Sequence, residues 1–151
     1  MFKLSYDAYS VHEIITQQGY IHEQHEVCTE DGYVLQMNRI TNSCSMNVVY
    51  FQHGIVDSNT TWVVHGPGES IAFAAYDDGC DVFMGNFRGV YPRKVTPWRD
   101  QMQREGKADY WFYSIDHLAK YDIRAFIEAI FNIKVEDFKR CYPDQCRGLK
   151  N

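Results

Sequence analysis

The spacing of hydrophobic and polar residues predicts a short helix and then a hairpin near the start of the chain. Apolar residues recur at helical spacing from Val11 to Gln18, behind a capping box that begins at Ser10. Two strand-like segments follow, Glu23–Cys28 and Tyr33–Ile40. The Thr-Glu-Asp-Gly segment between them supplies turn residues, so an antiparallel pair is predicted.

The middle of the chain predicts a strand, a helix and a second strand. Val48–Phe51 is an unbroken run of β-branched and aromatic residues, which is typical of an interior strand covered on both faces. A helix is predicted over Glu69–Asp78 and a buried strand over Asp81–Met84. The short connections favour a parallel α/β unit with a right-handed crossover.

Hydrophobic periodicity is weak in residues 88–107 and strongest in residues 114–133. Arg88–Lys107 is rich in Arg, Pro and Gly and is predicted to form a loop. In Ser114–Ile133 apolar residues recur every three or four positions, which predicts a long helix packed on the core. No element is predicted beyond Lys139, so residues 139–151 are expected to form an irregular tail of one domain, residues 1–151.

Composition limits the classes of protein. At 151 residues, with 45% hydrophobic and 23% charged residues, the chain fits one globular domain. The net charge is −5 and Lys and Arg are scattered, so no nucleic-acid partner is predicted. No segment has the roughly 18 apolar residues of a transmembrane segment, and the N-terminus lacks the apolar stretch of a signal peptide. A cytoplasmic location is therefore expected if Met1 is the natural start.

The cysteines give no clear metal or disulfide pattern. None forms a CxxC pair, and an odd number cannot close into a complete disulfide framework. Reduced thiols are the simplest interpretation, and a disulfide or half a metal site at Cys141 and Cys146 is the less favoured one. No metal or other cofactor is predicted.

The strongest candidate for chemistry is His53-Gly54, directly after the Val48–Phe51 strand. A glycine allows a sharp turn, and the amide of Ile55 can then point toward a site where negative charge develops, as in an oxyanion hole. An ordinary glycine turn, with His53 hydrogen-bonded locally, explains the dipeptide at least as well. The local sequence leaves both interpretations open.

Four segments, in order along the chain, carry a resemblance to a known family. They are "EIITQQGYIHEQHEVCTEDGYVLQMNRI", "VVYFQHGIVDSNTTWV", "SIAFAAYDDGCDVFMGNFRG" and "YWFYSIDHLAKYDIRAFIEAI". Together they span roughly residues 10–138 and resemble the acid-lipase family of α/β-hydrolases, which includes gastric and lysosomal acid lipases and a related plant and protist group. The resemblance implies a partial α/β-hydrolase fold of class α/β.

The resemblance also implies a serine ester hydrolase of lipid metabolism, acting on triacylglycerols or sterol esters. By position, the amide of Ile55 would be one oxyanion donor, and Gln52, His53 and Gly54 would shape its turn. Lipid esters are therefore the substrate expected for the complete enzyme.

Asn86, Arg88 and Gly89 match the family's Asn-x-Arg-Gly turn. We interpret this turn as architectural, because an Arg fork can hold several loop carbonyls. A role in orienting the floor of the active site is the less favoured alternative. The following "VYPRKVTP" departs from the family pattern.

The chain has no predicted catalytic residue. None of its seven serines lies in a G-x-S-x-G elbow, and Ser58 and Ser70 do not occupy the elbow position. His65 and His117 have no nucleophile predicted beside them and are interpreted as exposed or structural. The family's nucleophile strand would follow the helix near Ile133, and the sequence ends before any match to it.

Two functions stay open. The first is the N-terminal part of an acid-lipase-type esterase, inactive as this chain alone, whose exposed sheet edge favours self-association. The second is a non-catalytic module that uses the same scaffold to bind a lipid or a protein. A G-x-S-x-G elbow encoded soon after Ile133 would favour the first.

Overall fold

The first helix follows from its capping residues. The computed structural model describes residues 10–146, and α1 (Val11–Gln17) begins directly after Ser10. The side chain of Ser10 accepts a hydrogen bond from the amide of Glu13, and Glu13 accepts one from the amide of Ser10. These bonds satisfy amides that a helix start leaves free, and the predicted helix is confirmed to within one residue.

The predicted hairpin is confirmed as β1 (His22–Cys28) and β2 (Tyr33–Ile40), which pair antiparallel. Gly32 lies in the turn with a φ of 89°, a conformation that glycine adopts without steric cost. A Cβ on Gly32 would also lie 2.4 Å from the ring of Trp98. Two independent constraints therefore require glycine at this position.

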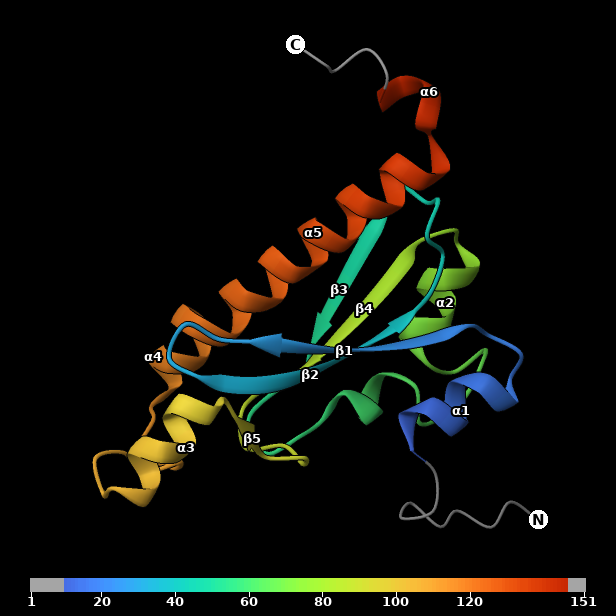
Figure 1. Ribbon diagram of the computed structural model, residues 1–151. Helices are drawn as coiled ribbons and strands as arrows, with labels where there is room; N and C mark the ends of the chain where they lie inside the picture. Colours follow the sequence, from blue (N-terminus) through green and yellow to red (C-terminus); the bar gives the residue numbers. More distant parts are fainter. Residues whose placement is uncertain (1–9, 147–151) are drawn as a thin grey trace, which may run out of the picture.

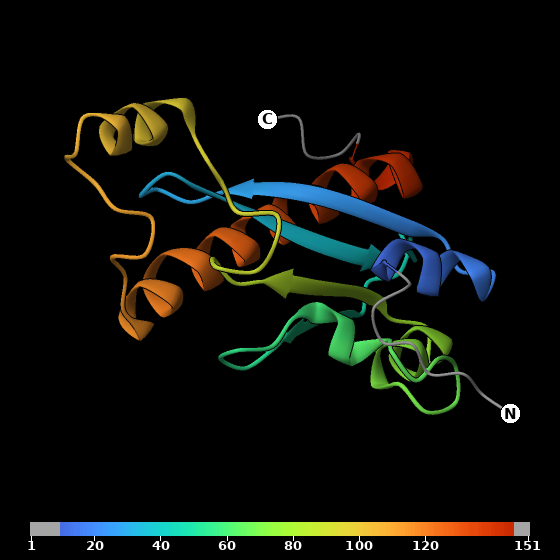
Figure 2. The ribbon, with the colours of Figure 1, turned by 90° about the horizontal axis from the view of Figure 1, so that it is seen from below.

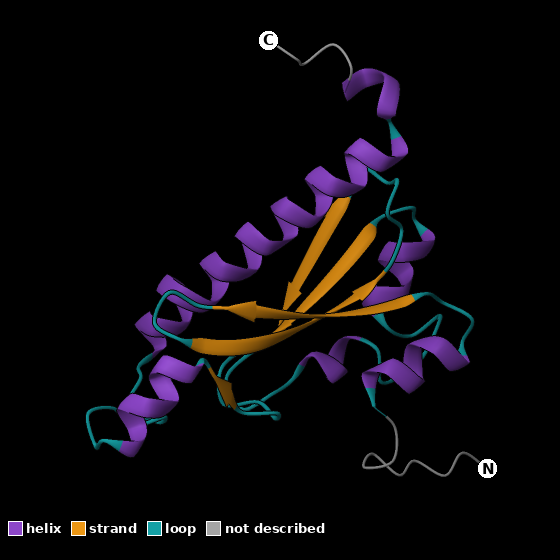
Figure 3. Cartoon of the chain, viewed as in Figure 1, coloured by secondary structure: helices purple, strands orange, loops and turns teal. Residues whose placement is uncertain are grey.

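The next two strands, β3 (Val48–Gln52) and β4 (Asp81–Asn86), are parallel neighbours, as predicted. The helix α2 (Ile71–Asp77) connects them, after a short 3-10 helix, η1 (Asn59–Trp62). Figure 3 shows the arrows of β3 and β4 pointing the same way. The strand order is β1-β2-β4-β3, and β5 (Lys94–Val95) also pairs with β2. The predicted α/β class is confirmed.

The interior position predicted for Val48–Phe51 is wrong, because β3 is the last strand of the described sheet. Its residues are exposed or half-buried, and Val48 is 40% exposed. The interior position belongs to β4, whose six residues are all buried. An apolar run with little alternation predicts a strand, but it does not give the number of neighbouring strands.

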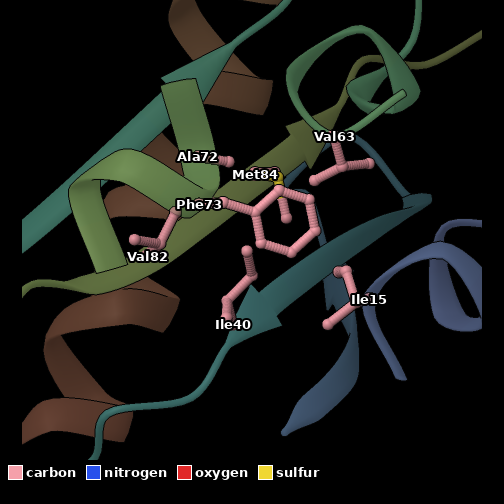
Figure 4. Close-up of a cluster of buried hydrophobic side chains, with 7 residues drawn as sticks. All are labelled: Ile15, Ile40, Val63, Ala72, Phe73, Val82 and Met84. Atoms are coloured by element: carbon pink, nitrogen blue, oxygen red, sulfur yellow. The ribbon is translucent and has the colours of Figure 1, made fainter. Parts of the chain in front are cut away.

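Two hydrophobic cores lie on opposite faces of β4, because successive side chains of a strand alternate between faces. Val82 and Met84 point into the core between the sheet and helices α1 and α2, where they surround Phe73 (Figure 4). Phe83 points into the other core, against α5 (Arg124–Cys141). Figure 1 shows α5 along one side of the sheet and α1 and α2 on the other.

The predicted loop Arg88–Lys107 contains regular structure, so that prediction is wrong for β5 and for α3 (Pro97–Arg104). Thr96 is the N-cap of α3 and Pro97 its first residue, a favourable start for a helix. No residue of α3 is buried, so hydrophobic periodicity cannot reveal it. In Figure 2, α3 (yellow) lies at the end of the molecule toward which β4 points, and α1 and α2 lie at the other end.

The long C-terminal helix forms in three parts: α4 (Ile115–His117), a π-helical segment η2 (Leu118–Ile123) and α5. Ser114 is its N-cap, as predicted. The helix runs past its predicted end, and α6 (Pro143–Cys146) follows. Residues 139–141 and 143–146 of the tail predicted to be irregular are therefore helical, and residues 147–151 lie outside the described residues. Within residues 10–146, no helix is long and apolar enough to cross a membrane.

A disulfide joins Cys44 to Cys141. The prediction of reduced thiols is wrong for these two residues, and Cys141 is not available to pair with Cys146. The partners are 97 positions apart, so their spacing gave no signal. The hydroxyl of Tyr142 donates to the carbonyl of Cys44 at 2.8 Å beside the bond. The end of α5 is thus fastened to the connection between β2 and β3, while Cys28 and Cys80 are free thiols.

A buried ion cluster also holds α5 against the sheet. Arg39 on β2 donates to both carboxylate oxygens of Asp81 on β4, at 2.8 and 2.6 Å, and to Asp137 on α5. Lys134 on α5 reaches Asp81 at 2.7 Å. Burial acts to raise the pKa of Asp81, but hydrogen bonds from Arg39 and Lys134 outweigh it and hold that pKa below its usual value.

Candidate functional site

A cavity of about 450 Å³ opens at the carboxyl ends of the parallel strands β3 and β4. Loops that follow parallel strands meet at this end of a sheet, which is where open α/β folds bind ligands. Three segments form its wall: the 53–57 loop after β3, the 87–93 segment after β4, and residues from Trp111 to Leu118. The two predicted motifs, His53-Gly54 and Asn86-x-Arg88-Gly89, therefore meet at one site.

His53 fixes the position of the 53–57 loop relative to the 87–93 segment. It is buried, and its Nδ1 lies 2.7 Å from the carbonyl oxygen of Gly54. The amide of Phe87 donates to its Nε2 at 3.1 Å. A carbonyl can only accept and an amide can only donate, so the proton of this neutral imidazole is on Nδ1. Both nitrogens are occupied, which makes His53 a structural link between the loops rather than a base.

Ile55 lies in the wall of the cavity, and its amide donates no hydrogen bond within residues 10–146. The side chains of Ile55 and Val56 project outward, and Val56 is completely exposed. Val56 has a φ of 65°, in the left-handed region that β-branched residues rarely adopt. An unpartnered amide beside a strained, exposed turn is the arrangement from which an anion-binding donor can be built.

The predicted reason for Gly54 differs from the observed one. Gly54 does not adopt a positive φ, and a Cβ there would have no heavy atom within 4 Å. The left-handed residue of the turn is Val56, two positions later. Backbone freedom at Gly54 is therefore not what turns the chain at the end of β3.

Asn86 anchors the second motif. Its Oδ1 accepts a hydrogen bond from the amide of Asn59 at 2.8 Å, and its Nδ2 donates to Gln36 at 3.3 Å. Gly89 has a φ of 95°, and a Cβ on it would lie 2.6 Å from the hydroxyl of Tyr113. The motif thus joins η1, β2 and the Trp111–Leu118 wall to the end of β4.

Arg88 binds carboxylates rather than the loop carbonyls expected of it. It donates to Asp122 at 2.9 and 2.6 Å and to Asp31 at 2.6 and 2.9 Å. The guanidinium also lies 3.8 Å from the ring centroid of Tyr33. The carboxylates are 57 positions before and 34 positions after Arg88, and the local motif gave no sign of either. One side chain therefore joins the hairpin, the turn after β4 and the C-terminal helix.

The pKa values of the two carboxylates that bind Arg88 are shifted in opposite directions. Burial raises the pKa of Asp122, and the hydrogen bonds from Arg88 offset only part of that effect. Burial also acts to raise the pKa of Asp31, but hydrogen bonds from Arg88 and Thr29 outweigh it and lower that pKa. Asp122 lies in η2, and π-helical turns within α-helices are often associated with function.

The remaining sequence candidates have structural contacts. The hydroxyl of Ser114 lies 2.9 Å from Nδ1 of His117, a proximity that was not predicted. The same nitrogen also accepts a hydrogen bond from the backbone amide of Ser114. This pair is a helix cap. Ser70 accepts a hydrogen bond from the amide of His65, whose side chain is exposed. In residues 10–146, no group of three or more His, Cys, Asp and Glu side chains is placed to hold a metal ion.

Comparison with known proteins identifies relatives over most of the chain. The family model "Partial alpha/beta-hydrolase lipase region" matches residues 11–66. Gastric triacylglycerol lipase of Homo sapiens is 38% identical over 130 residues, which cover 80% of this chain and 31% of that protein. Lipase member K of Homo sapiens is 35% identical over 142 residues, which cover 88% of this chain and 34% of that protein.

A nematode relative gives the same result: lipase lipl-1 of Caenorhabditis elegans is 36% identical over 135 residues, which cover 84% of this chain and 29% of that protein. The chain spans about a third of the length of the curated relatives it matches. The mixed sheet, the matched region and these identities agree with the resemblance found in the sequence. The chain belongs to the acid-lipase family of α/β-hydrolases and corresponds to the N-terminal part of that family.

Proposed function

We propose that the chain supplies the oxyanion side of a site that hydrolyses lipid esters, with the amide of Ile55 as one donor. The observation that carries the proposal is the unpartnered amide at the carboxyl ends of two parallel strands. An ester carbonyl gains negative charge when a serine attacks it, and a fixed backbone amide stabilises that charge. The names of the relatives as lipases support the same reaction.

The rim of the cavity supports a lipid substrate. Ile55, Val56, Tyr91 and Trp111 line the cavity and are exposed, and Phe112 lies beside Trp111 with 86% exposure. Five large exposed apolar side chains around one opening are unusual, because apolar patches of this kind on protein surfaces mark binding sites. An acyl chain can cover them, so the proposed substrate class is a triacylglycerol or sterol ester.

A chimeric enzyme tests the proposed function. The matching segment of human gastric triacylglycerol lipase is replaced by this chain, and hydrolysis of a triacylglycerol is measured. Because the proposed donor and rim belong to this chain, the chimera is expected to retain turnover. A folded chimera, shown by its circular dichroism spectrum and thermal transition, that hydrolyses no ester would contradict the proposal.

The isolated chain is proposed to be inactive, since it holds one proposed donor but no serine in a nucleophile elbow. One oxyanion donor contributes on the order of 10²–10³-fold in an intact site and cannot replace a nucleophile and its base. The purified chain is expected to show no turnover of a nitrophenyl butyrate above buffer and no labelling by a fluorophosphonate. Turnover that disappears in Ser114→Ala would overturn this expectation and make the Ser114–His117 pair catalytic.

The open edge of β3 favours a second candidate function, a non-catalytic binding module. One side of this strand has no neighbour in the described sheet, and Val48 is exposed. Such an edge can pair with a strand of another chain, including a second copy. Light scattering across a concentration series tests this function: association that Val48→Lys abolishes supports it, and a monomer at every concentration contradicts it.

A further inference from the structure

Two histidines face each other where α1 meets the start of β1. Nδ1 of His12 lies 2.9 Å from Nδ1 of His22, and the ring centroids are 5.0 Å apart. His12 is exposed and His22 is half-buried. Neither residue lines the cavity at the ends of β3 and β4, so the proposed ester hydrolysis leaves this pair without a role.

The partners of His22 define where its proton lies. Its Nε2 is 2.7 Å from Oδ1 of Asn38, which is buried on β2. An amide oxygen only accepts, so Nε2 carries the proton and Nδ1 of His22 presents a lone pair toward His12. His12 donates from Nδ1 in this contact. Because the ring of His12 is exposed, its proton can move to Nε2, where water accepts the hydrogen bond. Both Nδ1 atoms then carry a lone pair, without any change in charge.

We propose that His12 and His22 form a binding site for a divalent transition metal ion of the Cu²⁺ or Ni²⁺ class. Imidazole nitrogens are common ligands of both ions. With metal–nitrogen bonds of about 2.0–2.1 Å, two nitrogens 2.9 Å apart subtend about 90° at the metal. That angle is the one between neighbouring ligands of a square-planar or octahedral ion. The tetrahedral geometry of zinc requires the two nitrogens to move apart.

Asn38 gives the site the support that metal-binding histidines usually have. A ligating imidazole commonly donates its other N–H to a carboxylate or carbonyl oxygen, which fixes the tautomer and the orientation of the ring. The bond from Nε2 of His22 to Oδ1 of Asn38 has this arrangement. In the described part of the chain, no third His, Cys, Asp or Glu joins the pair, so water fills the other coordination positions.

The bound ion has a structural consequence. His12 belongs to α1 and His22 to β1, so a metal ion between them links the helix to the sheet. A ligand that binds only the folded chain stabilises that chain by mass action. Loading with the metal is therefore expected to raise the temperature of thermal unfolding in proportion to the logarithm of the free metal concentration.

Calorimetric titration of the tag-free chain with Ni²⁺ tests the proposal, with His65→Ala as the matched control because His65 is also exposed but lies in another loop. The wild type is expected to bind one ion per chain. His12→Ala removes one of two ligands and is expected to weaken binding by at least about tenfold. His65→Ala is expected to bind as the wild type does.

Equal affinity in the wild type and His12→Ala would overturn the proposal, as would equal weakening in His65→Ala. His22→Ala removes the supported ligand, and its fold is checked by circular dichroism because His22 is half-buried. His12 is exposed, so the decisive variant does not depend on that check. With Cu²⁺ as the probe, coupling of two nitrogens in the electron paramagnetic resonance spectrum is expected. A spectrum of sulfur ligation would assign the ion to a cysteine and overturn the proposal.

Discussion

The backbone amide of Phe87 donates a hydrogen bond to Nε2 of His53 at 3.1 Å. This bond joins the loop after β3 to the turn after β4, so the position of the Ile55 amide depends on a side chain two residues before it. The other nitrogen of His53 binds the carbonyl of Gly54. The ring of His53 therefore bonds to both loops of the cavity wall.

Replacing His53 with Ala is expected to destabilise the chain by about 2–3 kcal/mol, because the partly buried Phe87 amide loses its acceptor and a cavity forms at the buried His53. His53→Gln places an amide oxygen near the position of Nε2, so a loss of about 1 kcal/mol is expected. Urea unfolding of both variants measures the difference. Equal losses in the two variants would show that the Phe87 bond contributes nothing.

Arg88 is expected to be among the least replaceable residues. Arg88→Met leaves Asp122 buried without its partner, and breaking such a pair typically costs about 3–5 kcal/mol. Adding Asp122→Asn removes the buried charge and keeps an acceptor for the Arg88 amide, so the double variant is expected to recover part of the loss. The midpoints of urea unfolding give both values, and a double variant less stable than Arg88→Met would contradict this account.

The two glycines of the site are expected to respond differently to alanine. Gly54 has a φ outside the left-handed region and open space around it, so Gly54→Ala is expected to change the free energy of unfolding by less than about 1 kcal/mol. Gly89 has a φ of 95° and faces Tyr113, so Gly89→Ala is expected to cost at least about 2 kcal/mol. Thermal unfolding of the pair checks this order. The reverse order would mean that Gly54 turns the loop after all.

The disulfide is expected to contribute strongly to stability. It closes a loop of 97 positions, for which loss of chain entropy in the unfolded state gives up to about 4–5 kcal/mol. Cys44→Ser with Cys141→Ser is expected to lower the urea midpoint, and Cys28→Ser serves as a control because that thiol is free and exposed. A wild type whose midpoint does not change on treatment with dithiothreitol would show that the bond is absent or adds nothing.

Local signals predicted the early part of the fold well. The capping box gave α1 and the turn residues gave the β1–β2 hairpin, since both depend on neighbours within a few positions. The parallel relation of β3 and β4 followed from short connections. The helix α3 was missed because it buries nothing, although Thr96-Pro97 is a recognisable helix start.

The long-range contacts of the site and of the rest of the fold could not be predicted, because they join distant positions. Arg88 and its two carboxylates, and Cys44 with Cys141, lie between 34 and 97 positions apart. The sequence predicted that the amide of Ile55, after His53-Gly54, is an oxyanion donor, but it assigned the turn to Gly54. The left-handed residue is Val56, and no propensity favours a β-branched residue there.

The most direct measurement of the central proposal is kcat of the gastric-lipase chimera with two changes at Ile55. Ile55→Pro removes the amide hydrogen, and Ile55→Leu keeps it with a side chain of similar size. Ile55→Pro is expected to lower kcat by about 10²–10³-fold, while Ile55→Leu is expected to leave it within a few-fold of the unmodified chimera. Equal kcat values for folded Ile55→Pro and Ile55→Leu chimeras would contradict the assignment of the Ile55 amide as an oxyanion donor.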